Sequence, residues 1–161
     1  MRLLKSGEDI FKKFGKIYSG GISGIGSIVS ILDGASKKFI IVADSDRTSN
    51  DKKIDFQNLY PDYKNSWFSY ADVDDKISTM EDFLTTDFIE SKIKKYNNEY
   101  IYDTKKNAIT NIENATKDKE IKQRIKNDLI DNLKKVNIKD SYSTYIDELK
   151  NKLDICNQNQ T

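Results

Sequence analysis

The segment from Phe39 to Arg47 restricts the fold of this chain more than any other part of the sequence. Five uncharged residues, Phe39 to Ala43, are followed at once by Asp44 and Asp46, with Arg47 directly behind them. A short apolar run of this kind is typical of a buried parallel strand, which brings polar side chains to the carboxyl edge of an α/β sheet, where ligands bind. Two carboxylates there suit a hard divalent cation, because such ions prefer oxygen ligands. The alternative is a strand that ends in a solvated, aspartate-rich turn.

The side chains that the sequence lacks exclude several classes of catalytic site. The 161 residues include no histidine, which excludes Ser-His-Asp catalysis, Cys-His catalysis and histidine zinc sites. The single cysteine, Cys156, cannot form an internal disulfide or a cysteine metal cluster. No apolar run approaches the length of a membrane span, so we predict a cytoplasmic protein with no membrane partner.

The order of apolar segments predicts an α/β fold with a small parallel sheet flanked by helices. A strand at 16–19, a helix at 22–32 and the strand at 39–43 form a βαβ unit. Residues 48–53 are predicted to form a polar loop before a short helix, and residues 66–71 form the next strand. Because parallel strands end at the same edge of a sheet, we expect the acids that follow them to lie close together.

The second half of the chain is predicted to be helical. A helix is expected at 87–96, and Asp87 and Glu90 are spaced like a capping box at its start. Two stripes of apolar residues at helical spacing are expected to face the core. They are Ile121, Ile125, Leu129, Leu133 and Val136, then Tyr142, Tyr145, Ile146, Leu149 and Leu153.

These elements predict a single domain, because the sequence contains no internal repeat and no segment of linker composition. The domain is expected to span residues 1–156, with an α/β part at 15–96 and a helical part at 104–154. Residues 157–161 are predicted to form a disordered tail.

Charge is unevenly distributed along the chain, although the net charge is only +1. Residues 71–90 carry seven acids and one base, whereas residues 91–139 carry thirteen bases and seven acids. An acidic segment followed by a basic helical region suits a metal site next to a phosphate-binding surface. A solvated, lysine-rich helical face explains the basic region equally well.

Three acids are the candidates for metal-assisted chemistry. If Asp44, Asp46 and Glu81 converge, they can hold one or two Mg²⁺ or Mn²⁺ ions, which polarise a phosphoryl oxygen and activate water. A lysine from the C-terminal part of the sequence is then needed to stabilise the charged transition state, and Lys134 and Lys135 are the candidates.

Phosphate binding is predicted at two places near these acids. Arg47 can bind a phosphate as a planar fork. The glycine-rich loop at 20–26 follows a predicted strand and opens a helix, so backbone N–H groups around Gly21, Ser23 and Gly24 can surround a phosphate. A tight turn with close helix packing explains the same glycines.

Three landmarks, taken in order, resemble a known family. They are Gly20-Gly21-Ile22-Ser23-Gly24-Ile25, then Ile41-Val42-Ala43-Asp44-Ser45-Asp46-Arg47, then Met80-Glu81-Asp82-Phe83-Leu84. Their order and spacing resemble the C-terminal Toprim domain of the overcoming-lysogenisation-defect (OLD) family of nucleases, over roughly half of the chain.

The resemblance implies a Toprim fold and metal-dependent cleavage of phosphodiester bonds in nucleic acid, with DNA as the first expectation. It implies that Asp44 and Asp46 bind Mg²⁺ or Mn²⁺ together with Glu81, with Asp82 beside it. It also implies an ATPase subunit or domain as a partner.

The chain departs from the family pattern at its N-terminus, where Ser6 stands in place of the glutamate expected before Gly7. The resemblance is therefore N-terminally incomplete, and the alternative function is an inactive Toprim-like module that binds a partner ATPase or nucleic acid. A third reading is a phosphatase similar to the haloacid dehalogenases, with Asp44 as the nucleophile and Asp46 as the acid/base.

Overall fold

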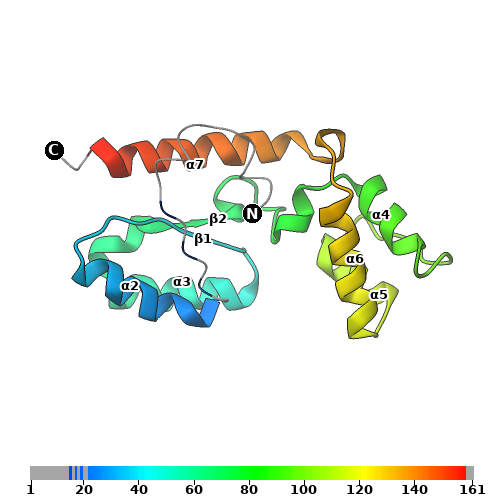
Figure 1. Cartoon of the computed structure of the whole chain (residues 1–161), viewed down its shortest axis with the longest axis horizontal. Helices are drawn as coiled ribbons and strands as arrows, with labels where there is room; N and C mark the ends of the chain where they lie inside the picture. The colour runs from blue at the N-terminus through cyan, green and yellow to red at the C-terminus, as the bar shows by residue number, and fades with distance from the viewer. Residues whose placement is uncertain (1–14, 16, 18, 20–21, 159–161) are drawn as a thin grey trace. The chain divides into compact units, whose positions relative to one another are not determined.

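The structure, a computed structural model, describes residues 15, 17, 19 and 22–158 (Figure 1). The chain divides into two compact units: unit 1 contains the chain through Ser69 and from Ile146 onward, and unit 2 is Tyr70–Tyr145. The described residues form a mixed α/β fold that is mostly helical and has one two-stranded parallel sheet. No helix among them is both long and apolar enough to cross a membrane.

The sheet of unit 1 is built from β1 (Ile41–Ala43) and β2 (Trp67–Ser69). The strands run parallel, with Ile41 opposite Trp67. They are joined by α3 (Arg47–Leu59) and the 3-10 helix η3 (Pro61–Ser66). Both strands lie within the segments predicted from the sequence, and each is shorter than predicted. The predicted strand at 16–19 includes residues outside the described part of the chain.

Helices α2 (Ile25–Gly34) and α3 lie against one face of this sheet (Figure 1). Their contribution to the core is Val29 and Phe56, which are buried together with Ala43 and Trp67. The Phe56 and Trp67 rings lie 5.6 Å apart between centroids. Burial of such aromatic side chains supplies most of the stability of a small sheet, because two strands alone are marginally stable in water.

The opposite face of the sheet carries Phe68, because successive strand residues point to opposite sides. Phe68 is buried, and the ammonium group of Lys152 lies 5.3 Å from its ring centroid. Lys152 belongs to α7 (Asp140–Gln158), whose residues from Ile146 onward are part of unit 1. Unit 1 is therefore a sheet with helices on both faces. The helix on the second face, α7, comes from the segment that the sequence assigned to a separate helical part.

The C-terminal end of α2 has a Schellman motif that places a serine in the left-handed region. The Lys37 N–H donates to the Leu32 carbonyl and the Ser36 N–H donates to the Asp33 carbonyl, both at 2.8 Å. Ser36 sits between them with φ of 52°. Glycine is the usual residue at this position, because a Cβ is strained there.

We expect Ser36→Gly to stabilise the chain by about 0.5–1 kcal/mol, since the strain removed exceeds the extra flexibility that glycine gives the unfolded state. Urea unfolding followed by fluorescence of Trp67, the single tryptophan, measures unit 1 directly. The matched control is Ala35→Gly, at φ of −89°, which should destabilise. A Ser36→Gly variant that loses stability as Ala35→Gly does would contradict this account.

Unit 2 is built around three short helices that pack on one another (Figure 1). They are α4 (Thr86–Lys94), α5 (Ala108–Ala115) and α6 (Lys119–Asp131). Their shared core includes Ile89, Ile93, Ile112, Ile125 and Leu129, each at most 2% exposed. The predicted stripe of α6 is thus confirmed at Ile125 and Leu129.

A cluster of aromatic rings forms a second apolar contact within unit 2. Phe83 of the 3-10 helix η5 (Met80–Phe83) contacts Tyr70, Tyr142 and Tyr145, with ring centroids 5.3–5.4 Å apart. The adjacent backbone is tied by an antiparallel bridge between Leu84 and Ile138. Burial of Tyr142 and Tyr145 confirms the first part of the second predicted stripe.

Four local predictions were wrong. The polar loop at 48–53 belongs to α3, because the Asp46 carboxylate caps that helix. Val136 is 79% exposed, because α6 ends at Asp131 and Val136 lies in the following 3-10 helix η6 (Lys135–Asn137). The predicted capping box of Asp87 and Glu90 does not form, because α4 begins at Thr86 and has Thr85 as its cap residue. Helix α7 continues through Gln158, beyond the start of the predicted tail.

Candidate functional site

The predicted acidic pair lies in unit 1, just after β1. Asp44 is exposed directly behind the strand, and Asp46 is exposed at the cap of α3. The Asp46 Oδ1 accepts a 2.7 Å hydrogen bond from the Ser49 N–H, which supports the first turn of α3. Arg47 is the exposed first residue of the same helix. Asp46 therefore has a structural role as a helix cap, and its role as a metal ligand stays a prediction.

The glycine-rich loop is described only in part. Ser23 is exposed and Gly24 is half-buried in the 3-10 helix η2 (Ile22–Gly24), whereas Gly21 lies outside the described residues. A Cβ built on Gly24 would lie 2.1 Å from the Ser19 carbonyl oxygen. Close backbone packing therefore requires glycine at this position, and a phosphate-binding role for the loop stays a prediction.

The remaining predicted site residues belong to unit 2. The Glu81 carboxylate is half-buried and lies 3.7 Å from the Lys126 ammonium of α6. Lys134 is exposed, and its backbone N–H donates to the Asn137 side chain at 3.1 Å. Among the described residues, no group of three or more histidine, cysteine, aspartate or glutamate side chains is placed to hold a metal ion.

Asp82 is buried, with 5% of its surface exposed, and binds backbone groups with both carboxylate oxygens. Its Oδ2 accepts from the N–H groups of Ser78 and Thr79 at 3.0 and 2.9 Å. Its Oδ1 accepts a 2.7 Å bond from the N–H of Ala108, the first residue of α5. The carboxylate thus joins η5 to the N-terminus of α5, where a helix favours negative charge.

A cleft of about 460 Å³ opens beside Asp82, and all the residues that line it belong to unit 2. We call it the basic cleft, because among the described residues four lysines and two aspartates line it. The lysines are Lys76, Lys105, Lys106 and Lys139, and the aspartates are Asp74 and Asp82. Hydroxyl groups of Thr86, Thr104 and Ser141 and the amide of Asn107 add uncharged polar groups.

The four lysines differ in the partners they have. The Lys139 ammonium donates to the Asp82 carbonyl oxygen at 2.8 Å, and the Lys106 ammonium lies 3.2 Å from Asp103. Lys76 and Lys105 form no ion pair with any residue that the structure describes. Because an ammonium group has three donors, all four can still bind an anion.

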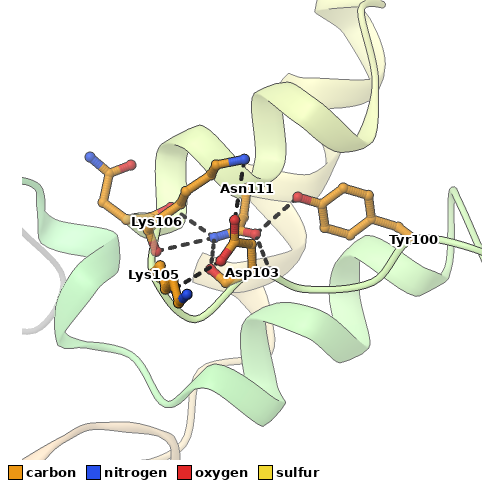
Figure 2. Close-up of polar contacts among 6 residues, drawn as sticks. Tyr100, Asp103, Lys105, Lys106 and Asn111 are labelled. Carbon is orange, nitrogen blue, oxygen red and sulfur yellow. Dashed lines mark hydrogen bonds and ion pairs between the residues drawn. The ribbon is translucent and has the colours of Figure 1, made fainter.

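A buried asparagine holds the loop that carries two of these lysines (Figure 2). Asn111 of α5 is fully buried, and its Nδ2 donates to the carbonyl oxygens of Asp103, Lys106 and Asn107. Its Oδ1 accepts from the Asp103 N–H at 2.8 Å and from the Tyr100 hydroxyl at 2.9 Å. Loop 103–107 is therefore fixed at both ends by one side chain.

Two pKa shifts favour this arrangement at neutral pH. The Lys105 N–H, and then the Lys106 side chain, lower the pKa of Asp103, so the loop keeps its ionised anchor. Burial, and then the charge of Asp82, raise the pKa of Tyr102 above its ordinary value. The Tyr102 phenol on the cleft wall is therefore neutral and does not repel an anion.

Comparisons with protein-family models, with curated proteins and with solved structures give no match to this chain. The basic cleft was missed in the sequence, because its lining residues lie between Asp74 and Ser141 and each lysine by itself is typical of a solvated surface. The excess of bases at 91–139 was the available signal, and three of the four lysines lie in that range.

Proposed function

We propose that this chain binds phosphate-bearing ligands in the basic cleft. The observation that carries the proposal is that four lysines and three serine or threonine residues, from separate loops and helix starts, line one cavity. A concave site with a few convergent polar groups is the usual form of a small-ligand site. This function differs from the binding module that the sequence predicted, which was a Toprim-like module that binds a partner ATPase or nucleic acid.

The composition of the cleft favours phosphate over a single carboxylate. Several lysines act as separate point charges and suit an anion with more than one negative oxygen. The hydroxyl groups of Thr86, Thr104 and Ser141 are additional donors for tetrahedral oxygens. The first turns of α4 and α7 contribute Thr86 and Ser141, and helix starts add positive potential. The start of α5 is already bound by the Asp82 carboxylate.

The proposal predicts that pyrophosphate binds the full chain and that cleft lysines are needed. We expect Lys76→Gln and Lys105→Gln each to weaken pyrophosphate binding about 5–10-fold, because each variant removes one charge contact. Added salt should weaken the binding further, because it screens the remaining charges. Isothermal titration calorimetry measures both effects. Lys135→Gln is the matched control, because Lys135 is exposed in unit 2 outside the cleft. Equal affinities for all three variants would overturn the proposal.

A Toprim-type nuclease that uses Mg²⁺ or Mn²⁺ is the second proposal for this chain. It is supported by the position of Asp44, exposed at the carboxyl end of β1 beside a parallel strand, with Asp46 two residues further. A bound divalent ion would polarise the phosphodiester and activate water. In this proposal Arg47, at the start of α3, binds substrate phosphate, and the partner is an ATPase subunit or domain.

Plasmid cleavage tests the nuclease proposal. With Mg²⁺ or Mn²⁺ present, we expect supercoiled plasmid to be nicked by the full chain and Asp44→Ala to lower the rate at least about 100-fold, as expected for loss of a metal ligand. Asp51→Ala, an exposed acid on α3, is the control. Absence of cleavage with either ion, or equal cleavage by Asp44→Ala, would reject the proposal and leave the binding function unaffected.

A further inference from the structure

We infer that the ligand of the basic cleft is a nucleoside phosphate, with its phosphate among the lysines and its base against Tyr102. The inference rests on the proposed function and adds the class of ligand. It comes from the size of the cleft and from the apolar side chains that line it beside the charged ones.

The cleft has room for more than a bare phosphate. Its volume of about 460 Å³ falls within the range of about 300–1,000 Å³ that encloses organic ligands. A phosphate ion fills only a small part of that space, since one water molecule occupies about 30 Å³ in the liquid. The cleft can therefore accommodate a phosphate that carries a further group of considerable size.

The cleft wall has an apolar part suited to a planar ring. Tyr102 is half-buried, packs against the helical core of unit 2 and also lines the cleft. Ile77, Ile89 and Ala108 line it too but are at most 3% exposed, so Tyr102 offers the ring that a ligand can contact. Core packing holds the Tyr102 ring in place before a ligand binds, which lowers the entropy cost of stacking. Base stacking on an aromatic side chain is favourable for every base, because every base has a π-face.

The position of Tyr102 in the cleft distinguishes double-stranded nucleic acid from single strands and free nucleotides. A duplex keeps its bases paired inside and presents only base edges in its grooves, so its rings cannot reach Tyr102. A free nucleotide and the phosphorylated end of a single strand both have an accessible ring next to a phosphate. These two share the chemistry that the cleft recognises, and the experiment distinguishes them.

Calorimetric titration of the full chain with adenosine 5′-monophosphate, ribose 5-phosphate and pyrophosphate tests the inference. We expect the nucleotide to bind at least about tenfold more tightly than ribose 5-phosphate, which corresponds to about 1.4 kcal/mol of base contact. Equal affinities of these two ligands, with pyrophosphate still bound through Lys105, would overturn the inference and keep the proposed function. Failure of all three to bind would reject both.

Variants of Tyr102 locate the base contact. Tyr102→Leu should reduce the nucleotide affinity to that of ribose 5-phosphate without changing the latter, whereas Tyr102→Phe should keep the difference. If Tyr102→Leu fails to fold, the ligand series on the unmodified chain and on Tyr102→Phe still decides the question. A 5′-phosphorylated oligodeoxyadenylate then distinguishes a strand end from a free nucleotide. Tighter binding than that of the nucleotide identifies a strand end as the ligand, and equal or weaker binding identifies the free nucleotide. Both results support a nucleoside phosphate.

Discussion

Asp82→Ala is expected to destabilise unit 2 by about 3–5 kcal/mol, because it leaves several buried N–H groups without an acceptor. The N–H groups of Ser78, Thr79 and Ala108 all donate to this carboxylate; the bond from Ala108 is buried and the other two are partly buried. Urea unfolding followed by far-ultraviolet circular dichroism reports the loss, since unit 2 is largely helical.

Asp82→Asn is the more informative variant, because it keeps the shape of the side chain. One oxygen becomes an NH₂ group, which faces N–H donors in either orientation, so a loss of about 2–3 kcal/mol is expected. The control is Glu81→Gln, whose carboxylate is partly exposed and 3.7 Å from Lys126, for which at most about 1 kcal/mol is expected. Asp82→Asn with the stability of Glu81→Gln would contradict a structural role.

The same variant distinguishes this role from the metal-binding role predicted from the resemblance. Carboxylates that gather to hold a cation repel one another without it, so neutralising one of them should stabilise the metal-free chain. The hydrogen bonds of Asp82 predict the opposite sign. Measurement of Asp82→Asn in a chelating buffer therefore gives a stabilisation for a metal ligand and a destabilisation for a structural anchor.

The strands were predictable from sequence because their signal is local. An apolar run bounded by Asp44 marks β1, and the aromatic segment around Trp67 marks β2. Their chain order alone indicates a parallel pair, because a helix separates them. The exact ends were not predictable, since they depend on which residues find a hydrogen-bonding partner in the other strand.

Helix α3 shows how one residue supports two interpretations. Asp46 after an apolar strand was interpreted as a metal ligand, yet aspartate is also a favoured helix cap, and Asp46 accepts the Ser49 N–H. Because the polar segment from Thr48 to Lys53 has no apolar periodicity, the cap was the available signal for a helix there. Burial of Phe56 then anchors the helix to the sheet.

The basic cleft was beyond sequence reasoning for a different reason. Lys76 and Lys139 are 63 positions apart in the sequence and line the same cavity. Their proximity depends on long-range contacts, such as the backbone bond from the Lys139 N–H to the Phe83 carbonyl at 2.8 Å. No periodic pattern encodes a pairing of this kind, so the lysines were interpreted only as an excess of positive charge.

Asn111→Ala is expected to lower the stability of unit 2 by about 3–4 kcal/mol and to weaken ligand binding in the basic cleft more than the loss of one lysine does. The side chain is fully buried and makes five hydrogen bonds, so its removal leaves buried carbonyl and N–H groups unpaired, each at a cost of about 1–3 kcal/mol before relaxation. Loop 103–107, which carries Lys105 and Lys106, then loses its anchor (Figure 2).

Asn111→Asp tests whether stability depends on the N–H donors of the side chain or only on the space that it fills. It has the same size, but it turns an oxygen toward the carbonyl oxygens of Asp103, Lys106 and Asn107 and buries a charge. We expect it to be at least as destabilising as Asn111→Ala, because an unpaired buried charge costs several kcal/mol. Asn98→Ala is the control, since Asn98 is exposed in the same unit and should change stability by less than about 0.5 kcal/mol.

Pyrophosphate titration of Asn111→Ala below its unfolding temperature connects the loop to the cleft. Because Lys105 and Lys106 depend on the loop for their positions, this variant should bind more weakly than Lys105→Gln, although it retains every cleft lysine. Tyr100→Phe removes only one of the five hydrogen bonds and should retain most of the affinity. If Asn111→Ala binds as tightly as the unmodified chain, the lysines act as mobile surface charges, and a preformed site at the basic cleft is disproved.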